Sequence, residues 1–458
     1  MAVDGRSEIS SGVDGEGVPL GASVFGRTNP VILTFARYYL PGFRAGGPIR
    51  TISSMVERLG DSFEFRIVTL DRDLGDGCSY PDVQSGVWTP CGKALVHYVA
   101  PNCFGLREVA EIVRSTPHDV IYLNSFFDPR FTQQVLVSHR LGRLSGRPIV
   151  IASRGEFSAG ALRIKRWRKL AFIRLAKLFK IYDGLTWQAS SVREVDDIQR
   201  ALSVGQNMAG RVGVSGHVAV SPDLSHSGDI AGPSIGTAPA RGMHAPLQAC
   251  FLSRISPMKN LDFALRVLAQ VHVPVRFVIY GPIEDLVYWS ECEALIAKLP
   301  SNVEAMHKGA IQPELVVSTL AQHDLFLFPT RGENFGHVIQ EALRAGLPLL
   351  ISDQTPWQQL AERGVGWDLP LHDLGAFAHR VEDVAGWSLT ERQQCAARAR
   401  AFALETSKNP DTLEANRRLF LDAISSAMSA KSEKAQKGAG IDDNAAPTHH
   451  IDTERSKQ

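Results

Sequence analysis

The chain has 458 residues, too many for one ordinary domain and enough for two domains of about 180 to 200 residues each with additional terminal segments. Hydrophobic residues make up 44% and charged residues 21%, as in a globular protein with a large core, and the formal net charge of +1 argues against a nucleic-acid partner. No stretch reaches the roughly 18 consecutive apolar residues of a membrane span, and residues 1–30 lack the apolar segment of a secretory signal. The six cysteines are scattered along the chain, without the spacing of a disulfide framework or of a zinc site. We therefore expect a cytoplasmic protein with reduced thiols.

Short apolar runs alternate with longer amphipathic stretches from Val31 onward, which is the pattern of parallel strands covered by helices. Helical spacing of apolar residues begins at Ile49, after a loop rich in Gly and Pro. The expected strands of this part are residues 31–35, 65–69, 120–123 and 149–152. We therefore assign residues 1–29 to a flexible N-terminus and residues 30–220 to a first Rossmann-like domain.

The composition shifts to Ser, Gly, Pro and Ala over residues 221–247, which predicts a linker between domains. A second series of strands follows at residues 250–253, 276–280, 303–306, 325–328 and 349–352, with helices at 261–271 and 316–322. We assign residues 248–410 to a second Rossmann-like domain, 411–427 to a helix that packs back on the first domain and 428–458 to a disordered tail. The predicted fold is α/β, with two doubly wound domains facing across a cleft that receives the carboxyl ends of the strands.

The most informative segment is a strand, turn and helix over residues 325–348. The strand ends at Phe328, the turn contains Gly332, and the helix starts near Gly336, whose free amides suit a phosphate or sugar hydroxyls. Glu333 precedes the helix and Glu341 lies within it, up to roughly 12 Å away at about 1.5 Å per residue. One ligand with two sets of hydroxyl groups could therefore meet both carboxylates.

Glu333 and Glu341 form an E-x7-E motif that resembles the donor-binding site of the GT4 family of retaining glycosyltransferases, which have the GT-B fold. The segment 251–260 resembles the family's strand and loop in which Arg254 and Lys259 hold the donor diphosphate. Fixed cations suit a diphosphate leaving group that no metal neutralises. The family usually has Gly where Ser253 stands, and Ser is also small.

The resemblance implies a set of site residues on both sides of the cleft. It places Glu333, Arg254 and Lys259 in catalysis and adds further donor-binding residues, which are Asn334, Phe335, Gly336, Glu341 and, in the Gly-rich loop of the first domain, Gly46 and Gly47. The acceptor side is expected to include Arg50, Arg154 and Glu156. Arg154 stands in a region where many relatives have His, which leaves its role open.

The function that the resemblance implies is retaining, metal-independent transfer of a hexose-type sugar from a UDP- or GDP-linked donor. The expected acceptor is a glycan or a lipid-linked glycan in surface polysaccharide synthesis, and no cofactor and no metal are expected. Two alternatives remain open. The chain could be another GT-B-type enzyme, such as a nucleotide-sugar epimerase or a phosphorylase, or a non-catalytic module that binds sugar nucleotides or membranes.

A second acidic motif, Asp71-Arg72-Asp73, matches the DxD signature by which another glycosyltransferase fold holds a divalent metal. A bare DxD triplet occurs often by chance, and the single mixed sheet of that other fold is not predicted here. We therefore expect no metal at this motif.

Residues 163–180 contain basic and apolar residues and no acidic residue, and they are expected to form one amphipathic helix. The apolar positions at helical spacing are Ile164, Trp167, Leu170, Ala171, Leu175 and Leu178. Three interpretations are open, which are an ordinary helix packed on the sheet, an anionic membrane surface as partner and, less favoured, nucleic acid. We expect the membrane partner, with the protein held peripherally at the inner face of the plasma membrane.

Overall fold

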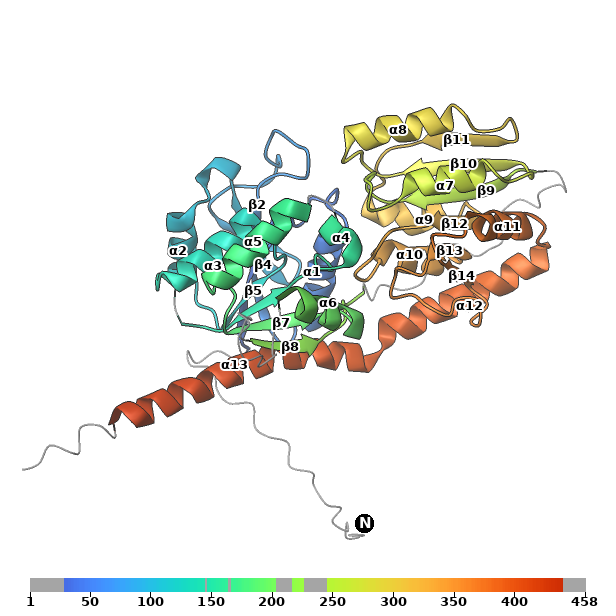
Figure 1. The fold of residues 1–458 in the computed structure, drawn as a ribbon. Helices are drawn as coiled ribbons and strands as arrows, with labels where there is room; N and C mark the ends of the chain where they lie inside the picture. The colour runs from blue at the N-terminus through green and yellow to red at the C-terminus, as the bar shows by residue number, and fades with distance from the viewer. Residues whose placement is uncertain (1–28, 145, 164–165, 203–215, 226–244, 440–458) are drawn as a thin grey trace, which may run out of the picture.

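The computed structural model describes residues 29–144, 146–163, 166–202, 216–225 and 245–439. These residues form two α/β domains side by side, joined a second time by two long C-terminal helices (Figure 1). The predicted α/β fold with two parallel-sheet domains is confirmed. The predicted flexible residues 1–28 and the end of the tail, residues 440–458, lie outside the described residues.

The first domain has an eight-stranded sheet in the order β3-β4-β2-β1-β5-β6-β7-β8, parallel except for the edge strand β3. Its strands are β1 (Val31–Phe35), β2 (Glu64–Leu70), β3 (Trp88–Cys91), β4 (Ala94–Val99), β5 (Val120–Leu123), β6 (Ile149–Ala152), β7 (Leu185–Ala189) and β8 (Gly216–Val220). Its α-helices are α1 (Gly47–Leu59), α2 (Leu106–Ser115), α3 (Gln134–Arg140), α4 (Ala159–Arg163), α5 (Arg166–Leu178) and α6 (Val192–Leu202). The four strands predicted from apolar runs are all present, and each is buried at nearly every position because helices cover both faces of a parallel sheet.

The second domain has a six-stranded parallel sheet in the order β11-β10-β9-β12-β13-β14. Its strands are β9 (Leu247–Leu252), β10 (Val275–Tyr280), β11 (Val303–His307), β12 (Leu325–Phe328), β13 (Leu349–Ser352) and β14 (Gly366–Leu369). Its helices are α7 (Leu261–Leu268), α8 (Leu286–Ile296), α9 (Val316–Leu320), α10 (His337–Ala345), α11 (Leu374–Ala385) and α12 (Leu389–Lys408). The sheet order reverses between β9 and β12, and parallel α/β sheets bind ligands beyond the strand ends at such a point.

The last helix, α13 (Pro410–Ala439), crosses from the second domain to the first. The Phe420 ring lies 5.7 Å from that of Phe63 and 5.4 Å from that of Tyr122, in the core of the first domain. The predicted start of the disordered tail at residue 428 is therefore too early in the sequence, because α13 continues to Ala439. The Ala- and Lys-rich composition that we took for disorder also has high helix propensity.

Two further expectations need correction. The predicted linker 221–247 starts too early, because Ser221, Asp223 and Leu224 are buried against the first domain, while residues 226–244 lie outside the described part of the chain. Within the predicted helix over 163–180 the structure describes the end of α4 at Arg163 and α5 (Arg166–Leu178), while residues 164–165, including Ile164, lie outside the described residues. None of the described helices combines the length and apolar character that crossing a bilayer requires.

Candidate active site

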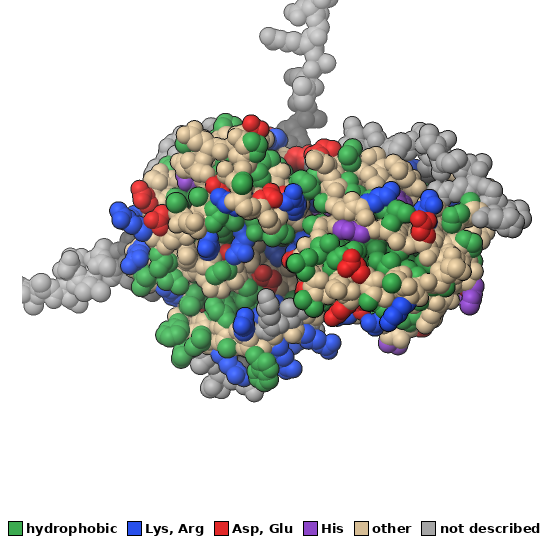
Figure 2. All heavy atoms as spheres, turned by 90° about the horizontal axis from the view of Figure 1, so that it is seen from above, with side chains coloured by type: hydrophobic (Ala, Val, Ile, Leu, Met, Phe, Trp, Pro, Cys, Tyr) green, Lys and Arg blue, Asp and Glu red, His purple; other side chains and the backbone are tan. Residues whose placement is uncertain are grey.

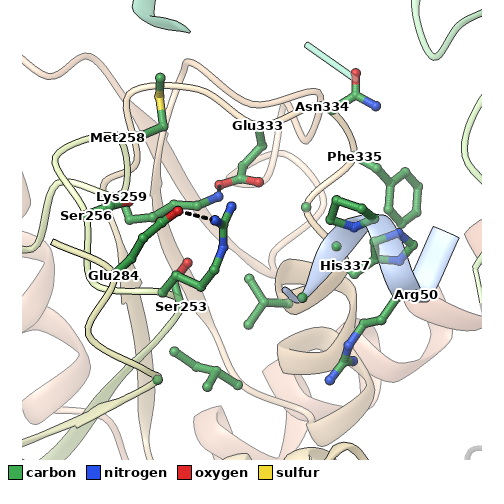
Figure 3. Close-up of a pocket in the computed structure, with 18 of the residues that line it drawn as sticks. Arg50, Ser253, Ser256, Met258, Lys259, Glu284, Glu333, Asn334, Phe335 and His337 are labelled. Carbon is green, nitrogen blue, oxygen red and sulfur yellow. Dashed lines mark hydrogen bonds and ion pairs between the residues drawn. The ribbon is translucent and has the colours of Figure 1, made fainter. Parts of the chain in front are cut away.

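A cavity of about 630 Å³ lies between the two domains, beyond the carboxyl ends of β1, β6, β9 and β12. Figure 2 shows the two domains meeting along a groove, and Figure 3 shows the cavity at close range. The cavity wall includes every residue that the sequence predicted for the site: Gly46, Gly47, Arg50, Arg154, Glu156, Arg254, Lys259, Glu333, Asn334, Phe335, Gly336 and Glu341. Residues more than 280 positions apart in the chain are thus brought to one surface.

The loop after β9 provides two cations, and each is paired with a carboxylate. The Arg254 guanidinium donates to Glu284 at 2.6 Å, and the Lys259 ammonium donates to Glu333 at 2.5 Å (Figure 3). The loop is anchored at Asn260, which has a left-handed backbone (φ 62°) and donates its side-chain amide to the Pro329 carbonyl at 2.8 Å. This hydrogen bond ties the β9 loop to the end of β12, so the cations and the Glu333 loop keep a fixed relation.

The turn before α10 presents Glu333 and the helix N-terminus to the cavity. Gly336 precedes the helix with φ 80°, a left-handed conformation that favours glycine, and a Cβ there would lie 2.9 Å from the Ile339 side chain. Thr330 donates its hydroxyl to the Glu333 carboxylate at 3.2 Å. The indole of Trp357 donates to the Phe335 carbonyl at 2.6 Å, which fixes the turn on the second domain.

The Gly-rich loop of the first domain brings a second helix N-terminus to the same cavity. Gly46 has φ 70° and precedes α1, and a Cβ at Gly47 would lie 3.9 Å from the His337 ring at the start of α10. The amides at both helix starts carry partial positive charge. Together with Arg254 and Lys259 they make this end of the cavity suitable for an anion with several oxygens.

The DxD triplet holds loops of the first domain. The Asp73 carboxylate accepts from the amides of Phe43 at 2.8 Å and Arg44 at 3.0 Å, and so anchors the Gly-rich loop. The Asp71 carboxylate accepts from the Ser85 hydroxyl at 2.9 Å and from the Arg72 side chain at 2.8 Å. Both carboxylates are buried, and no group of three or more His, Cys, Asp or Glu with metal-site geometry occurs among the residues that the structure describes.

Several bonds join the two domains across the cavity. Arg50 of α1 pairs with Glu341 of α10, and the Thr51 hydroxyl lies 2.8 Å from Nε2 of His337. Arg50 therefore lies against Glu341, one of the predicted donor-binding carboxylates, and in Figure 3 it points away from the Lys259 and Glu333 pair. Desolvation at this contact lowers the pKa of His337 to about 3 and that of Arg50 to about 10, although both side chains keep some exposed surface.

A second interdomain contact forms around Asn334. Its side-chain amide donates to Asp223 at 3.1 Å, and its carbonyl oxygen accepts from the Ser190 hydroxyl at 2.8 Å. The Arg154 guanidinium pairs with the same Asp223 and donates to Asn124 at 2.7 Å. Arg154, expected on the acceptor side, thus orients a carboxylate that holds the two domains together.

Glu156 also forms hydrogen bonds within the first domain. Its carboxylate accepts from the Ser125 hydroxyl at 2.8 Å and from the amides of Phe126 at 2.6 Å and Phe127 at 3.1 Å. Burial raises the pKa of this carboxyl. The hydrogen bonds turn Glu156 toward the loop after β5, where it supports the cavity wall.

Sequence reasoning missed three residues of this site. Glu284 follows β10, and the rule that ligands bind at strand ends could have found it. Asp223 was placed in the linker because its surroundings are rich in Ser and Pro. His337 directly follows the motif, yet no pattern in the sequence indicates its contact with Thr51.

Two parallel-sheet domains that enclose a charged cavity at their strand ends define the GT-B glycosyltransferase fold. The fold is shared with Anabaena HepE in complex with UDP and glucose, at a TM-score of 0.56 and 18% identity, covering 87% of this chain and all of that one. It is also shared with the UDP-forming α,α-trehalose-phosphate synthase of Burkholderia xenovorans in complex with glucose-6-phosphate, at a TM-score of 0.62 and 13% identity, covering 86% of this chain and all of that one.

The sequence match is concentrated in the second domain. Residues 244–402 match the family model of glycosyl transferases group 1. A GDP-mannose-dependent α-mannosyltransferase of Mycobacterium tuberculosis is 31% identical over 159 residues, which are 34% of this chain and 38% of that protein. The second domain of this GT-B protein is therefore similar to the glycosyl transferases group 1 family over residues 244–402.

Proposed function

We propose that the protein is a retaining, metal-independent glycosyltransferase that moves a hexose-type sugar from a UDP- or GDP-linked donor. The observation that carries the proposal is the convergence of two helix N-termini, Arg254 and Lys259 on one cavity whose wall also holds Glu333 and Glu341. This arrangement suits a ligand that joins a diphosphate to two hydroxyl-bearing rings. The substrates named for the similar proteins, UDP with glucose and GDP-mannose, support the same donor class.

Each group has a defined part in the proposed reaction. Arg254 and Lys259 stabilise the negative charge that develops on the diphosphate as the sugar bond breaks. Glu333 accepts hydrogen bonds from the hexose hydroxyls and Glu341 from those of the ribose. Asn334, Phe335 and Gly336 position the sugar at the start of α10, and the proposal assigns no cofactor.

The engagement of the acidic groups supports retention of anomeric configuration. Of the carboxylates in the described cavity wall, Glu156, Asp223 and Asp285 accept hydrogen bonds from the protein, and Glu333 and Glu341 are assigned to donor hydroxyls. An inverting enzyme needs a general base aimed at the acceptor hydroxyl. With these carboxylates engaged, the departing diphosphate is the proposed proton acceptor, on the same face of the sugar as the attacking hydroxyl.

We further propose a glycan or lipid-linked glycan acceptor in surface polysaccharide synthesis, with the protein acting at the inner face of the plasma membrane. The acceptor would enter along the first-domain wall of the cavity, beside Ser158 and Ala161. Ala161 of this wall lies in α4.

The test is release of nucleoside diphosphate from a panel of UDP- and GDP-sugars, with and without a lipid extract as acceptor and with excess EDTA. We expect release that depends on the acceptor and survives EDTA, and NMR should show an α-glycoside from an α-linked donor. A β product would overturn retention, strict metal dependence would overturn the metal-free mechanism, and sugar isomerisation without acceptor would indicate an epimerase.

A matched pair of variants tests the site itself. Arg254 and Arg276 both form ion pairs with a Glu, at 2.6 and 2.9 Å, but only Arg254 lines the cavity. Loss of a charge-assisted contact to the leaving group costs about 2 to 4 kcal/mol, so Arg254→Ala should lower kcat by about 30-fold or more. Arg276→Ala should leave kcat unchanged, and equal effects of the two variants would contradict the assignment.

A further inference from the structure

The outer face of α5 exposes large apolar side chains, which include Trp167, Leu175 and Leu178 of the predicted amphipathic pattern. Trp167 is 81% exposed, Leu178 67%, Phe179 66% and Leu175 52%. The residues that α5 buries lie on its other side, where Ile173 is 5% and Ala176 1% exposed. The helix therefore has two apolar faces, and only the inner one is used to pack on the first domain.

The spacing of the exposed residues makes them one continuous stripe. Trp167, Leu175 and Leu178 are separated by eight and three positions, which places them along one side of the helix, and Phe179 extends the stripe past its end. Single exposed apolar residues are common on protein surfaces and need no explanation. A row of large side chains that includes a tryptophan is instead typical of a surface that contacts another phase or partner.

The charge around the stripe has one sign. Arg163, Arg166, Arg168, Arg174 and Lys180 are all exposed, and residues 163–182 include no Asp or Glu. Figure 2 shows basic side chains beside hydrophobic ones on the first domain. An uninterrupted basic border is complementary to an anionic surface.

Two other cations of the segment face inward. Lys169 donates to the Ala161 carbonyl at 2.7 Å and lies 5.0 Å from the centre of the Phe127 ring, and partial burial lowers the pKa of Lys177. The cations available to an external surface are therefore mainly the arginines. This distinction decides which substitutions test the outer face without disturbing the packing.

We propose that the outer face of α5 docks the protein on an anionic lipid bilayer, with Trp167, Leu175, Leu178 and Phe179 in the interfacial layer and the arginines at the lipid head groups. A helix of this kind lies in the plane of the interface with its apolar side chains roughly 5 to 10 Å deep. Tryptophan favours that layer because its ring is apolar and its N–H remains wet.

The place of α5 in the fold gives the docking a consequence for the active site. Ser158 and Ala161 line the cavity, Ala161 lies in α4, and α5 begins at Arg166, five positions further along the chain. In Figure 1, α4 lies next to the second domain and α5 extends from it along the first domain. A bilayer under α5 would therefore lie beside the first-domain wall of the cavity. Docking itself needs no catalytic activity, so its failure and that of the proposed function are separate results.

The test is flotation with vesicles of phosphatidylcholine alone and with phosphatidylglycerol added, at low and high salt. We expect binding only to the anionic vesicles, weakening as salt rises. Each basic residue near such a surface contributes about 1 kcal/mol, or about fivefold in partitioning. The triple variant Arg166→Gln, Arg168→Gln, Arg174→Gln should therefore bind at least tenfold more weakly.

The matched control removes three exposed cations elsewhere, by Lys298→Gln, Lys308→Gln and Lys408→Gln. It has the same net charge as the first variant and should bind vesicles like the unaltered protein. Equal loss in both variants would mean that only net charge matters, and no loss in either would mean that α5 is not the docking face. Both results would overturn the proposal, as would an absence of vesicle binding by the unaltered protein.

A second measurement follows insertion directly. Lipids with brominated acyl chains should quench part of the tryptophan emission of the unaltered protein, and Trp167→Phe should remove that quenching while vesicle binding persists. Because Trp167 is highly exposed, the substitution should not disturb folding. Quenching that is unchanged in Trp167→Phe would overturn the assigned orientation. Self-association that Trp167→Ala abolishes, with no binding to vesicles, would show that a second copy covers this face instead.

Discussion

Acidification should open the cleft through His337. This side chain begins α10 in the second domain, and its Nε2 lies 2.8 Å from the Thr51 hydroxyl of the first domain. Burial lowers its pKa from 6.5 to about 3, with Arg50 and Arg154 adding repulsion. A state with the domains apart would return the imidazole to water. Between about pH 6.5 and pH 3 that state binds more protons, so the stabilisation of the closed form is complete above this window and is lost as pH falls.

The size of the effect follows from the two pKa values. At about pH 5, an imidazole of pKa 6.5 in the open state and about 3 in the closed state favours opening by about 2 kcal/mol relative to neutral pH. His337→Gln retains a hydrogen-bonding group near Thr51 and removes the titration. We therefore expect small-angle scattering to show a larger radius of gyration at about pH 5 than at neutral pH for the unaltered protein, and no such change for the variant.

His118 provides the control. It is buried in the first domain, its Nδ1 lies 2.7 Å from the Thr116 carbonyl, and burial lowers its pKa as well, but it does not line the cavity. His118→Gln should change the pH dependence of unfolding and leave the opening of the cleft intact. The reasoning is refuted if His337→Gln opens on acidification like the unaltered protein, or if His118→Gln suppresses the opening.

Three further outcomes are expected. Lys259→Ala should lower kcat by about 30-fold or more, because a charge on the leaving group loses its partner, and steady-state kinetics would contradict the role if kcat stayed within about threefold. Glu341→Gln should chiefly raise the donor KM, since ribose contacts exist before and during the reaction, and a fall in kcat alone would argue against ribose binding. Gly160→Val should weaken donor binding, because a Cβ at this position would lie 3.0 Å from the Arg331 carbonyl of the other domain. Gly146→Val is the control and should have no effect, because a Cβ at that position has no atom within 4 Å.

The parts of the fold that could be predicted are those whose own residues show a recognisable pattern. Buried parallel strands give uninterrupted apolar runs, so β1, β5 and β12 could be assigned to within a residue. β7 was missed because its run is interrupted by Thr186 and by Gln188, a buried amide whose side chain donates to the Ser221 carbonyl at 3.0 Å. A buried glutamine in this strand is explained only by its hydrogen bond to Ser221, which the sequence does not show.

The composition of the site was predictable, and most of its internal pairing was not. A motif lists which residues reach the cavity, because strand ends and helix starts place them there. The motif does not show that Arg154 forms an ion pair with Asp223, 69 positions away, or that Arg50 forms one with Glu341 across the cleft. The same limit applies to α5, since periodicity identifies one set of apolar positions and only the packed structure shows that Ile173 and Ala176 are buried while Trp167, Leu175 and Leu178 are exposed.

The pairing within the cavity bears on which ligand the site selects. In two of the pairs, Lys259 with Glu333 and Arg50 with Glu341, the proposed function assigns the carboxylate to donor hydroxyls. A free diphosphate would draw Lys259 away and leave the partly buried Glu333 carboxylate without its partner, which costs several kcal/mol for a buried pair. A free sugar would offer hydroxyls to carboxylates that already have stronger, charged partners. A nucleotide-sugar supplies both groups at once, so that Lys259 exchanges Glu333 for a phosphate while the carboxylates gain hydroxyls. The ligand-free pairing therefore favours the intact donor over either of its parts, as a transferase that must hold its substrate until the acceptor arrives requires.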